Sequence, residues 1–577
     1  MDNLGIARIF TNIGDLLEIK GANPFKIRAY RNAADIVGHM AEPIADLGDA
    51  EVRALPGIGK DLTAKIRELI DTAALAYYDE LRQEFPPTIL EMLRLQGVGP
   101  KTVAVLYGEL GIETLDDLET AATEGRLRTL KGMGPKKEQL LLRSLAEHRR
   151  RVGRHLIGHA DQVASRVIDY LRADAPETAI FPVGSLRRGC ETCGDVDLLA
   201  IGTNDQLMAR FTSFPEVERI LGQGPTRSSV LLRGDVQADL RLVPSESAGA
   251  AAQYFTGSKA HNIAVRDRAL QRGLKLNEYG LFRVADDHRV AGAFEAEIYA
   301  ALGLAYVPPE LRENRGEIRA AAAGDLPRLI ERTDLRGDLH SHTTATDGTA
   351  DVDTMARAAR DAGLEYLAIT DHSQALAMAN GLDEPRALAH ARHIREVGER
   401  LDGIALLAGI ECDIRADGTL DLAEDCLAEL DLVIASVHSA FGQDEAQMTD
   451  RILCAIESPV VDVVGHPTGR LLLRRDPYKL DIEQVLQAAA RTGVAMEINS
   501  QVHRLDLSDM HARLALARGV KLVISTDAHA PAGFDLLRWG VTVARRAWAE
   551  PIDVLNTQPL EAFRASLRRH RTHSPSA

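Results

Sequence analysis

The stretch Gly184–Leu199, GSLRRGCETCGDVDLL, decides how the rest of this sequence is interpreted. It predicts a glycine-serine turn with two arginines, followed by a strand that carries Asp195 and Asp197. Because side chains two apart on a strand point to the same face, the two carboxylates converge, while Val196 and Leu198 enter the core. Two carboxylates held this closely repel unless a cation lies between them, and Mg²⁺ and Mn²⁺ prefer oxygen ligands. The stretch therefore predicts a divalent-metal site.

The turn upstream and a second strand extend this predicted site. Gly184 allows a close backbone approach. Ser185, Arg187 and Arg188 offer donors suited to phosphate oxygens. A third carboxylate, Asp239, lies in the strand-like segment VQADLRLV. A lone Asp-x-Asp is more often a solvated strand end, but the turn and the third aspartate together are typical of nucleotidyltransferases with two-metal chemistry.

Length and composition bound the class of protein. A chain of 577 residues is too long for one hydrophobic core, so three or four domains are expected. The net charge of -16 argues against nonspecific coating of nucleic acid, so any DNA contact must be local. No apolar run approaches membrane-span length, and the first 20 residues mix charges among hydrophobics, which argues against a signal peptide. We therefore expect a cytoplasmic protein, associated with the nucleoid.

The five cysteines also suit a reducing compartment, because they form no disulfide framework. Cys190 and Cys193 form a C-x-x-C, but no second such pair completes a zinc site. They are interpreted as part of the loop beside the carboxylates.

Three glycine-rich loops recur in the first part of the chain, LPGIGK (Leu55–Lys60), LQGVGPK (Leu95–Lys101) and LKGMGPKK (Leu130–Lys137). Each predicts a tight bend between helices, after which the helix N-terminus offers N–H groups to an anion. One such turn is most often a plain helix connection, but three with nearby lysines resemble helix-hairpin-helix motifs, which contact the DNA backbone without reading sequence. The candidate DNA-binding residues of these loops are Gly57, Gly59, Lys60, Gly97, Gly99, Lys101, Gly132 and Gly134.

From about residue 155 the pattern becomes mixed α/β, and YFTGSKAHNIAVRDRA (Tyr254–Ala269) follows Asp239. GSLRRG, D-V-D, DLRLVP and YFTGS, in this order and at close spacing, resemble the palm and nucleotide-binding region of family X DNA polymerases, the group that includes polymerase beta. The resemblance covers residues 1 to about 312. It implies that Asp195, Asp197 and Asp239 hold catalytic Mg²⁺ or Mn²⁺. The residues that it implies for nucleotide binding are Ser185, Arg188, Tyr254, Phe255, Gly257, Asn262 and Arg266.

The same resemblance implies that the N-terminal region holds the 5′-phosphate of a DNA gap. Lys26, Tyr30 and Arg31 match its phosphate-binding side. Lys65 matches the lysine that forms a Schiff base with an abasic sugar in members with lyase activity. This chain departs from the family at Asp61, an acidic residue that would weaken a 5′-phosphate site. A solvated helix lysine is therefore an equally good interpretation of Lys65.

Seven short apolar segments, each followed by polar residues, occupy the last part of the chain: RGDLHSH, YLAITDHS, ALLAGIECD, LDLVIASVHS, VDVVGHPTG, GVAMEINS and KLVISTDAH. Helical patterns separate several of them, which predicts a β/α barrel with its site at the C-terminal ends of the strands. Imidazole with carboxylate suits Mn²⁺, Zn²⁺ or Fe²⁺, and nine ligands are too many for one ion, so two or three ions are inferred. The candidate ligands are His340, His342, Asp347, His372, Glu411, His438, His466, Asp527 and His529.

The motifs H-x-H, T-D-H, G-I-E, S-V-H, G-H-P and T-D-A-H resemble, in this order, the PHP (polymerase and histidinol phosphatase) family over residues 336 to about 570. Clustered metals suit phosphoester hydrolysis. Both resemblances together match bacterial family X DNA polymerases with a C-terminal PHP domain. They imply a monomeric gap-filling repair polymerase that binds dNTPs and gapped or nicked DNA with a 5′-phosphate. They further imply a 3′-5′ exonuclease in the barrel, with abasic-site cleavage and 3′-phosphate removal as additional candidate activities.

The expected fold is multidomain. Its parts are a helical 5′-phosphate or lyase-like domain (1–80), a helical DNA-binding domain with two further hairpins (81–154), an α/β nucleotidyltransferase palm (155–245), a nucleotide-binding subdomain (246–312), a linker (313–335) and a distorted (β/α)7 PHP barrel (336–577). Two alternatives are a template-independent nucleotidyltransferase acting on RNA and a non-enzymatic DNA-end scaffold. The three hairpins and YFTGS argue against the first, and the complete ligand sets argue against the second.

Overall fold

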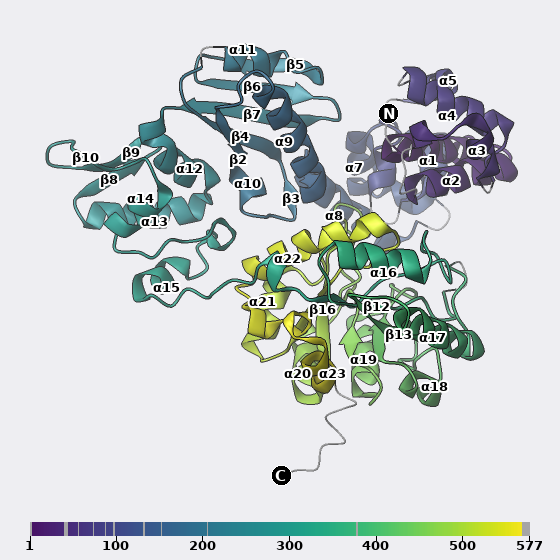
Figure 1. Ribbon diagram of the computed structural model, residues 1–577. Helices are drawn as coiled ribbons and strands as arrows, with labels where there is room; N and C mark the ends of the chain where they lie inside the picture. The colour runs from purple at the N-terminus through teal and green to yellow at the C-terminus, as the bar shows by residue number, and fades with distance from the viewer. Residues whose placement is uncertain are drawn as a thin grey trace, which may run out of the picture. The chain divides into compact units, whose positions relative to one another are not determined.

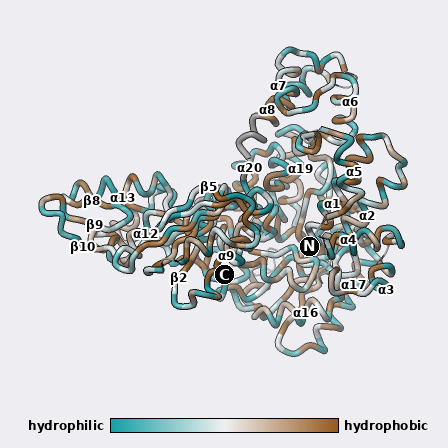
Figure 2. The backbone as a smooth tube through the Cα atoms, turned by 90° about the horizontal axis from the view of Figure 1, so that it is seen from above, coloured by the Kyte–Doolittle hydropathy of each residue, from teal (hydrophilic) through white to brown (hydrophobic). Residues whose placement is uncertain are grey.

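The computed structural model describes residues 3–39, 44–55, 57–72, 74–86, 88–95, 98–130, 133–151, 153–204, 206–376 and 379–567. The chain divides into two compact units, 1–152 and 153–577 (Figure 1). Figure 2 shows hydrophilic and hydrophobic residues interspersed along the backbone. No helix within the described ranges has the length and apolarity needed to cross a bilayer.

The first unit is helical in its described residues, as expected. α1 places Ile6, Phe10 and Ile13 at helical spacing, and all three are fully buried. Tyr30 of α2 packs edge-on against Phe10, with ring centroids 5.6 Å apart. The elements are α1 Asn3–Ile19, α2 Pro24–His39, η1 Ile44–Asp46, α3 Asp49–Ala54, α4 Lys60–Thr72, α5 Ala76–Gln83, η2 Met92–Arg94, α6 Pro100–Leu110, α7 Leu115–Thr123, η3 Arg126–Thr129 and α8 Pro135–Arg151.

The second unit begins with the palm, whose five strands lie in the order β2-β4-β7-β6-β5. β4 and β7 are parallel neighbours, and the other pairs of this sheet are antiparallel. Val196 and Leu198 of β4 are buried with α9 in one core, which confirms the expected strand faces. The elements are β1 His155–Leu156, α9 Ile157–Arg172, β2 Ala179–Pro182, α10 Gly184–Arg187, β3 Thr192–Cys193, β4 Asp195–Ile201, α11 Leu207–Thr212, β5 Val217–Gln223, β6 Arg227–Leu232 and β7 Val236–Val243.

A smaller lobe follows, built on the antiparallel sheet β10-β9-β8. The segment 313–335, interpreted from the sequence as a linker, contains the short helix α15 and is packed rather than free. Glu317 of α15 is fully buried and lies 2.7 Å from His261 Nδ1. The elements are η4 Ser245–Ser247, α12 Ala248–Thr256, α13 Lys259–Gln271, β8 Leu274–Asn277, β9 Gly280–Arg283, β10 Arg289–Ala291, α14 Glu295–Ala301, η5 Pro309–Leu311, α15 Glu317–Ala323 and η6 Arg332–Asp334.

The last part of the chain is a seven-stranded parallel barrel, as the seven apolar segments predicted. Its strands lie in sequence order from β11 to β17, and a bridge between Ser341 and Ala528 brings the first and last strands together. The barrel is therefore nearly closed. The strands are β11 Gly337–Asp338, β12 Tyr366–Ile369, β13 Ala405–Asp413, β14 Leu432–Ser436, β15 Val463–Val464, β16 Ala495–Asn499 and β17 Leu522–Ser525.

Helices surround the barrel, and most of the longer ones begin at a side-chain cap. Asp351, Asp383, Asp444 and Asp481 each accept a hydrogen bond from a backbone N–H three residues later. These caps end the preceding loops at defined residues and so help to fix the strand ends that carry the ligands. The helices are α16 Val352–Asp361, α17 Glu384–Gly398, α18 Glu424–Ala428, α19 Glu445–Glu457, α20 Ile482–Thr492, α21 Asp509–Ala517, η8 Pro531–Leu536, α22 Leu537–Arg546, η9 Pro551–Asp553, η10 Leu555–Thr557 and α23 Leu560–Ser566.

Candidate active sites

The three palm aspartates lie together, two in the first half of β4 and one near the middle of β7. Asp197 is the register partner of Asp239 across these parallel strands, and Asp195 precedes Asp197 by two residues. One carboxylate oxygen from each aspartate lies within 4.8 Å of the other two. Ser229 Oγ and Gln237 Nε2 donate hydrogen bonds to Asp239, the second over 2.7 Å, and hold its carboxylate in the cluster.

These carboxylates repel one another. Burial, together with the charges of Asp195 and Asp239, raises the pKa of Asp197 to about 7. Burial and the charge of Asp239 also raise the pKa of Asp195. Such shifts are expected where carboxylates share a site without a neutralising charge. A cluster of oxygen donors with excess negative charge fits a hard divalent cation.

The phosphate-side turn is a single helical turn, α10, rather than an open loop. Gly184 has a φ of +63°, and a Cβ atom there would lie 2.4 Å from Asp197 Oδ2. Glycine is therefore required for the turn to approach the carboxylate. Arg188 forms an ion pair with Glu313 at 3.0 Å and donates a hydrogen bond to the carbonyl of Thr256. The turn thus connects the carboxylate cluster to the smaller lobe.

Two predicted nucleotide-binding aromatics end α12. The rings of Tyr254 and Phe255 pack edge to face, with centroids 5.2 Å apart. The guanidinium of Arg241, which shares a strand face with Asp239, lies 4.3 Å from the centroid of the Phe255 ring. Asn262 Nδ2 donates a hydrogen bond to the carbonyl of Tyr254 over 2.7 Å. These contacts fix the end of α12 beside the palm strand that carries Asp239.

The other predicted nucleotide-side residues lie in α10, directly after α12 and on α13. Ser185 is half-buried in α10, and Arg266 is exposed on α13. Gly257, with a φ of +70°, follows α12, and a Cβ atom there would lie 3.1 Å from Arg188 Nη1. The structure thus brings Gly257 and Arg188 together.

At the barrel mouth, eight of the nine predicted ligands form three overlapping groups, each with ligand atoms within 4.8 Å of one another. The groups are His342, Asp347, His372 and His529; His340, His342 and Asp527; and His372, Glu411 and His438. The ninth residue, His466, places Nε2 2.9 Å from Glu411 Oε1. Overlapping groups of this size have room for more than one ion.

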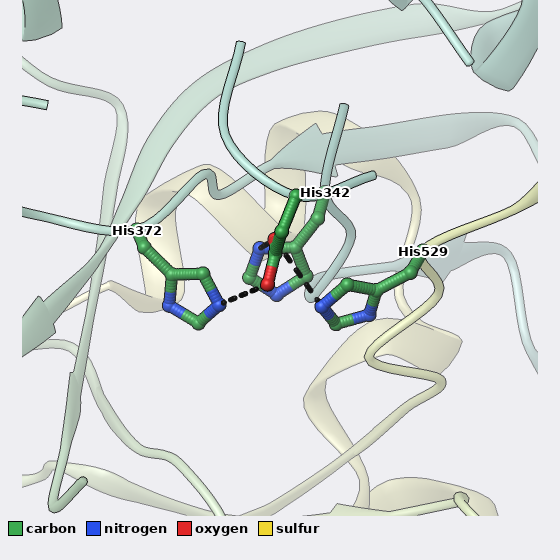
Figure 3. A group of neighbouring side chains, drawn as sticks. His342, His372 and His529 are labelled. Atoms are coloured by element: carbon green, nitrogen blue, oxygen red, sulfur yellow. Dashed lines mark ion pairs between the residues drawn. The ribbon is translucent and has the colours of Figure 1, made fainter. Parts of the chain in front are cut away.

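Figure 3 shows His342 between the rings of His372 and His529, and the ring centroids are 4.3 and 4.2 Å from that of His342. Asp347 lies among these rings, with carboxylate oxygens 3.4 Å from Nε2 of both His372 and His529. Imidazoles packed this closely around a carboxylate form a donor set typical of transition-metal sites.

Several buried ligand atoms at the mouth have close polar neighbours, such as His372 Nδ1 and Glu411 Oε2 at 2.8 Å, but no partner with hydrogen-bond geometry. They are His340 Nε2, His342 Nδ1 and Nε2, His372 Nδ1, Glu411 Oε2 and His466 Nδ1. Buried polar atoms are normally satisfied, so a cluster of unpaired ligand atoms requires an explanation. Divalent metal ions, when bound, would account for it, because each of these atoms is of a type that ligates transition metals.

In the barrel site, carboxylates and imidazoles shift each other's pKa values. Although burial favours a neutral carboxyl, His438 and His340 hold the pKa of Glu411 well below its usual range. Although burial favours neutral imidazole, Glu411 raises the pKa of His372 to about 10 and that of His438 to about 9. Burial, with neighbouring imidazoles, lowers the pKa of His342 to about 4. The metal-free site is therefore partly protonated at neutral pH.

Two carboxylates that support the ligands were not singled out from the sequence. Glu497 Oε1 lies 2.7 Å from His340 Nδ1, and its Oε2 accepts a hydrogen bond from the backbone of His466 over 2.6 Å. Asp371 accepts a hydrogen bond from the backbone N–H of Thr343 over 2.8 Å. Glu497 is thus a partner that can orient a metal-binding imidazole, whereas Asp371 holds the backbone directly after His342. The available signals were a lone acid in the apolar segment AMEIN and the aspartate within T-D-H.

In the first unit, the residues predicted to hold a 5′-phosphate lie on α2 and α4. The ammonium groups of Lys26 and Lys65 lie 4.6 and 5.3 Å from the centroid of the Tyr77 ring, so the two cations share one patch. Lys65 Nζ also forms an ion pair with Asp61 at 2.6 Å. The acidic residue seen in the sequence therefore contacts the predicted lysine directly.

Tyr30 and Arg31 are less available to bind a phosphate than the two lysines. Tyr30 is 2% exposed and stacks on Tyr77. Arg31 pairs with Asp15 at 2.8 Å and with Glu18 at 2.6 Å. A phosphate at Arg31 would compete with two carboxylates.

The hairpin glycines precede helices as expected. Gly57 has a φ of +75°, and Lys60 is the first residue of α4. Gly99 precedes α6, which contains Lys101, and Gly134 precedes α8. Gly97 and Gly132 lie outside the described residues. Each described hairpin thus leads into a helix N-terminus, whose N–H groups favour an anion.

Known families match four parts of the chain. A helix-hairpin-helix domain matches residues 1–75, and a SAM-like helix-hairpin-helix tandem matches residues 89–147. A DNA polymerase beta thumb matches residues 251–313, and a PHP domain matches residues 338–501. The thumb match contains Gly257 and Arg266, and the PHP match contains the ligands from the first barrel strand to the fifth.

Curated relatives agree with these matches. The chain is 37% identical over 573 residues to the DNA polymerase/3′-5′ exonuclease PolX of Bacillus subtilis (strain 168), covering 99% of this chain and 100% of that protein. The chain is also 32% identical over 233 residues to a probable phosphatase of Thermoanaerobacter sp. (strain X514), covering 38% of this chain and 89% of that protein. Over 211 residues it is 33% identical to a probable phosphatase of Shewanella sp. (strain MR-4), covering 34% of this chain and 79% of that protein. This chain belongs to the family X DNA polymerases that carry a C-terminal PHP domain.

Proposed function

We propose that this chain is a DNA-directed DNA polymerase that fills short gaps during DNA repair and trims DNA ends with a 3′-5′ exonuclease in its barrel. The observation that carries the proposal is the presence of two chemically different ligand sets on one chain, three carboxylates in the palm and a histidine-rich ring at the barrel mouth. The full-length match to a relative named for both activities supports it.

In the palm, Asp195, Asp197 and Asp239 would hold Mg²⁺ or Mn²⁺, ions that supply charge stabilisation for nucleotidyl transfer when bound. The protein itself positions the reactants. Ser185 and Arg188 would bind the incoming triphosphate, and Arg188 would exchange its ion pair with Glu313 for phosphate oxygens.

The end of α12 would complete the nucleotide pocket. Tyr254, Phe255 and Gly257 would shape the space for the sugar and exclude a ribose 2′-hydroxyl. Asn262 and Arg266, on α13, would face the nucleotide and the template.

In the barrel, the nine ligands would hold two or three Mn²⁺, Zn²⁺ or Fe²⁺ ions, which supply Lewis acidity for phosphoester hydrolysis when bound. Glu497 would keep His340 oriented, with its unpaired Nε2 available as a ligand atom. Removal of a 3′-phosphate is a second candidate activity of this site, favoured by the relatives named as probable phosphatases. Cleavage of abasic sites would use the same chemistry.

The DNA substrate that we propose is gapped or nicked and carries a 5′-phosphate. The hairpins would contact the phosphate backbone, and Lys26 with Lys65 would supply the positive patch for the 5′-phosphate. Because the net charge is -16, these contacts must be local. The protein would act as a monomer on DNA of the nucleoid, in the cytoplasm.

Primer extension on gapped DNA tests the polymerase proposal. We expect addition only of the dNTP complementary to the template base, and faster filling when the gap carries a 5′-phosphate. Lys26→Ala should remove the preference for the 5′-phosphate while leaving addition intact. Addition without a template, or equal use of all four dNTPs, would instead support a template-independent nucleotidyltransferase. Absence of both addition and degradation would support a scaffold.

A further inference from the structure

Within the second unit, the barrel supports the turn proposed to bind the triphosphate. Gly189, which follows Arg188, approaches α22 so closely that a Cβ atom there would lie 2.1 Å from Thr542 Cγ2. From the same helix, Arg546 Nη1 donates a hydrogen bond to the carbonyl of Arg188 over 2.7 Å. The position of this turn therefore depends on the barrel as well as on the palm.

One ion pair in this contact joins a palm loop to a barrel loop. Arg470 Nη2 and Nη1 donate to Glu191 Oε1 and Oε2 over 2.5 and 3.2 Å. The Arg470 side chain is only 10% exposed and the Glu191 side chain 22%. A bidentate and largely buried arginine-carboxylate pair fixes both geometry and distance, unlike a solvated surface pair.

On the palm side, Glu191 lies between two parts of the polymerase site. Arg188 precedes it by three residues and Asp195 follows it by four. The backbone N–H of Cys190 donates to the carbonyl of Ser185 over 3.0 Å, which closes the turn just before Glu191. A displacement of Glu191 would therefore also shift the phosphate-side turn and Asp195, the first metal carboxylate.

On the barrel side, Arg470 follows the ligand His466 by four residues and also holds a second loop. Its Nε donates to the carbonyl of Arg504 over 3.0 Å, and its Nη2 donates to the carbonyl of Leu505. The guanidinium of Arg504 lies 3.8 Å from Asp527 Oδ2. Arg470 therefore connects Glu191 to two loops that approach the barrel ligands.

We propose that Glu191 and Arg470 are positioning residues whose ion pair sets the geometry of both active sites at once. The inference rests on the proposed function, because dNTP addition and DNA degradation are two of its readouts. Removing the carboxylate leaves the arginine with an unpaired and largely buried charge, and it releases the two loops from each other. A change on the palm side should therefore alter the barrel, and a change on the barrel side should alter the palm.

Glu191→Gln is the first test, because it keeps the side-chain shape and leaves the backbone bonds of Arg470 in place. We expect the KM for dNTP in gap filling to rise about three- to tenfold with a smaller change in kcat. The Kd for Mn²⁺ at the barrel, measured by metal titration, should rise in the same variant, and DNA degradation should slow. Arg470→Gln should likewise raise the KM for dNTP, and Arg470→Lys should recover most of the loss.

A double-mutant cycle separates this positioning role from two local effects. Glu191→Gln combined with Arg470→Gln should cost little more than Arg470→Gln alone, because that substitution already removes the ion pair together with the bonds to the carbonyls of Arg504 and Leu505. The control is a second palm-barrel ion pair, Asp161 with Arg538 at 2.9 Å, which joins α9 to α22 rather than the two loops. Asp161→Asn should leave the dNTP KM and the Mn²⁺ Kd unchanged.

The proposal is overturned if Glu191→Gln affects only primer extension, if Arg470→Gln affects only degradation, or if their effects add. It is also overturned if Asp161→Asn reproduces both effects, because general domain contact would then explain them. If the unaltered protein neither extends primers nor degrades DNA, the proposed function fails instead. In that case the Mn²⁺ Kd of Glu191→Gln still decides the positioning role, because metal titration needs no activity.

Discussion

In the palm, three carboxylates face one another across two parallel strands, whereas at the barrel mouth carboxylates alternate with imidazoles. Burial and like charge raise the pKa of Asp197 to about 7 in the palm. In the barrel, imidazoles hold the pKa of Glu411 well below its usual range, and Glu411 raises the pKa of His372 to about 10. Without a cation, the palm therefore relieves its repulsion by holding a proton at Asp197 up to about pH 7, whereas the barrel pairs its carboxylates with protonated imidazoles.

This difference indicates how each site should bind metal. Oxygen ligands alone suit Mg²⁺ or Mn²⁺ that share substrate phosphates as ligands, so palm ions should exchange readily with the nucleotide. Imidazole ligands must be neutral to bind, so metal loading of the barrel should release protons. The two sites also share no ligand, so substitutions can remove one metal site and leave the other in place.

The largest expected effect is on the palm. Asp239→Ala should lower primer extension by about a thousandfold or more, because a charge-stabilising group of the two-metal site is lost. Degradation of single-stranded 3′ ends by the same preparation should change little, since Asp239 is not a barrel ligand. Both are measured on one labelled primer, with and without dNTPs. Near-normal extension would contradict the palm assignment.

The converse substitution tests the barrel. His340→Ala with His342→Ala removes two ligands of one metal group and should abolish Mn²⁺-dependent 3′-5′ degradation. Gap filling should persist, because the palm has its own carboxylates. Metal content after dialysis provides a readout independent of activity. Unchanged degradation would show that the barrel is not the nuclease.

The pH dependence of metal affinity should differ between the sites. Burial favours neutral imidazole, yet Glu411 raises the pKa of His372 and His438 to about 10 and 9, so a metal ion must displace protons below those values. Barrel affinity should therefore rise about tenfold per displaced proton for each pH unit up to about pH 9. Palm affinity should level off above about pH 7, where Asp197 is already ionised.

Competition with a metal-binding dye across this pH range measures both curves, with the Asp239→Ala and the double-histidine variants isolating each site. A barrel curve that is flat above pH 7 would contradict the expectation.

The smallest expected effect is on stability. Because the folded pKa of Asp197 lies above its ordinary value of 3.8, ionising it destabilises the metal-free fold as pH rises from about 4 to 7. Asp197→Asn should therefore raise the Tm of metal-free protein by about 1–3 °C at pH 8, and by less at pH 5. Thermal melting in excess chelator measures this difference. An equal or lower Tm for the variant at pH 8 would contradict the repulsion inferred for the palm.

Much of the architecture followed from local pattern. Alternation in VQADLRLV predicted the buried and polar faces of β7, and the seven apolar segments predicted the seven barrel strands. Motif spacing also predicted the ligand types, because residues two apart on a strand, or directly after it, share a direction. The short helix α10, expected as a turn, and the packing of residues 313–335 were not apparent, since both depend on contacts with other elements.

By itself, the sequence predicted the candidate metal ligands and the strands that they lie on or follow. Only the tertiary structure decided how those ligands divide into groups and which carboxylate orients His340, because Glu497 is 157 residues away in the chain. Only the tertiary structure likewise showed that Arg470 and Glu191, which are 279 residues apart, form an ion pair. Periodicity and motif spacing report a residue's own strand or helix, whereas such pairs arise from how separate elements pack together.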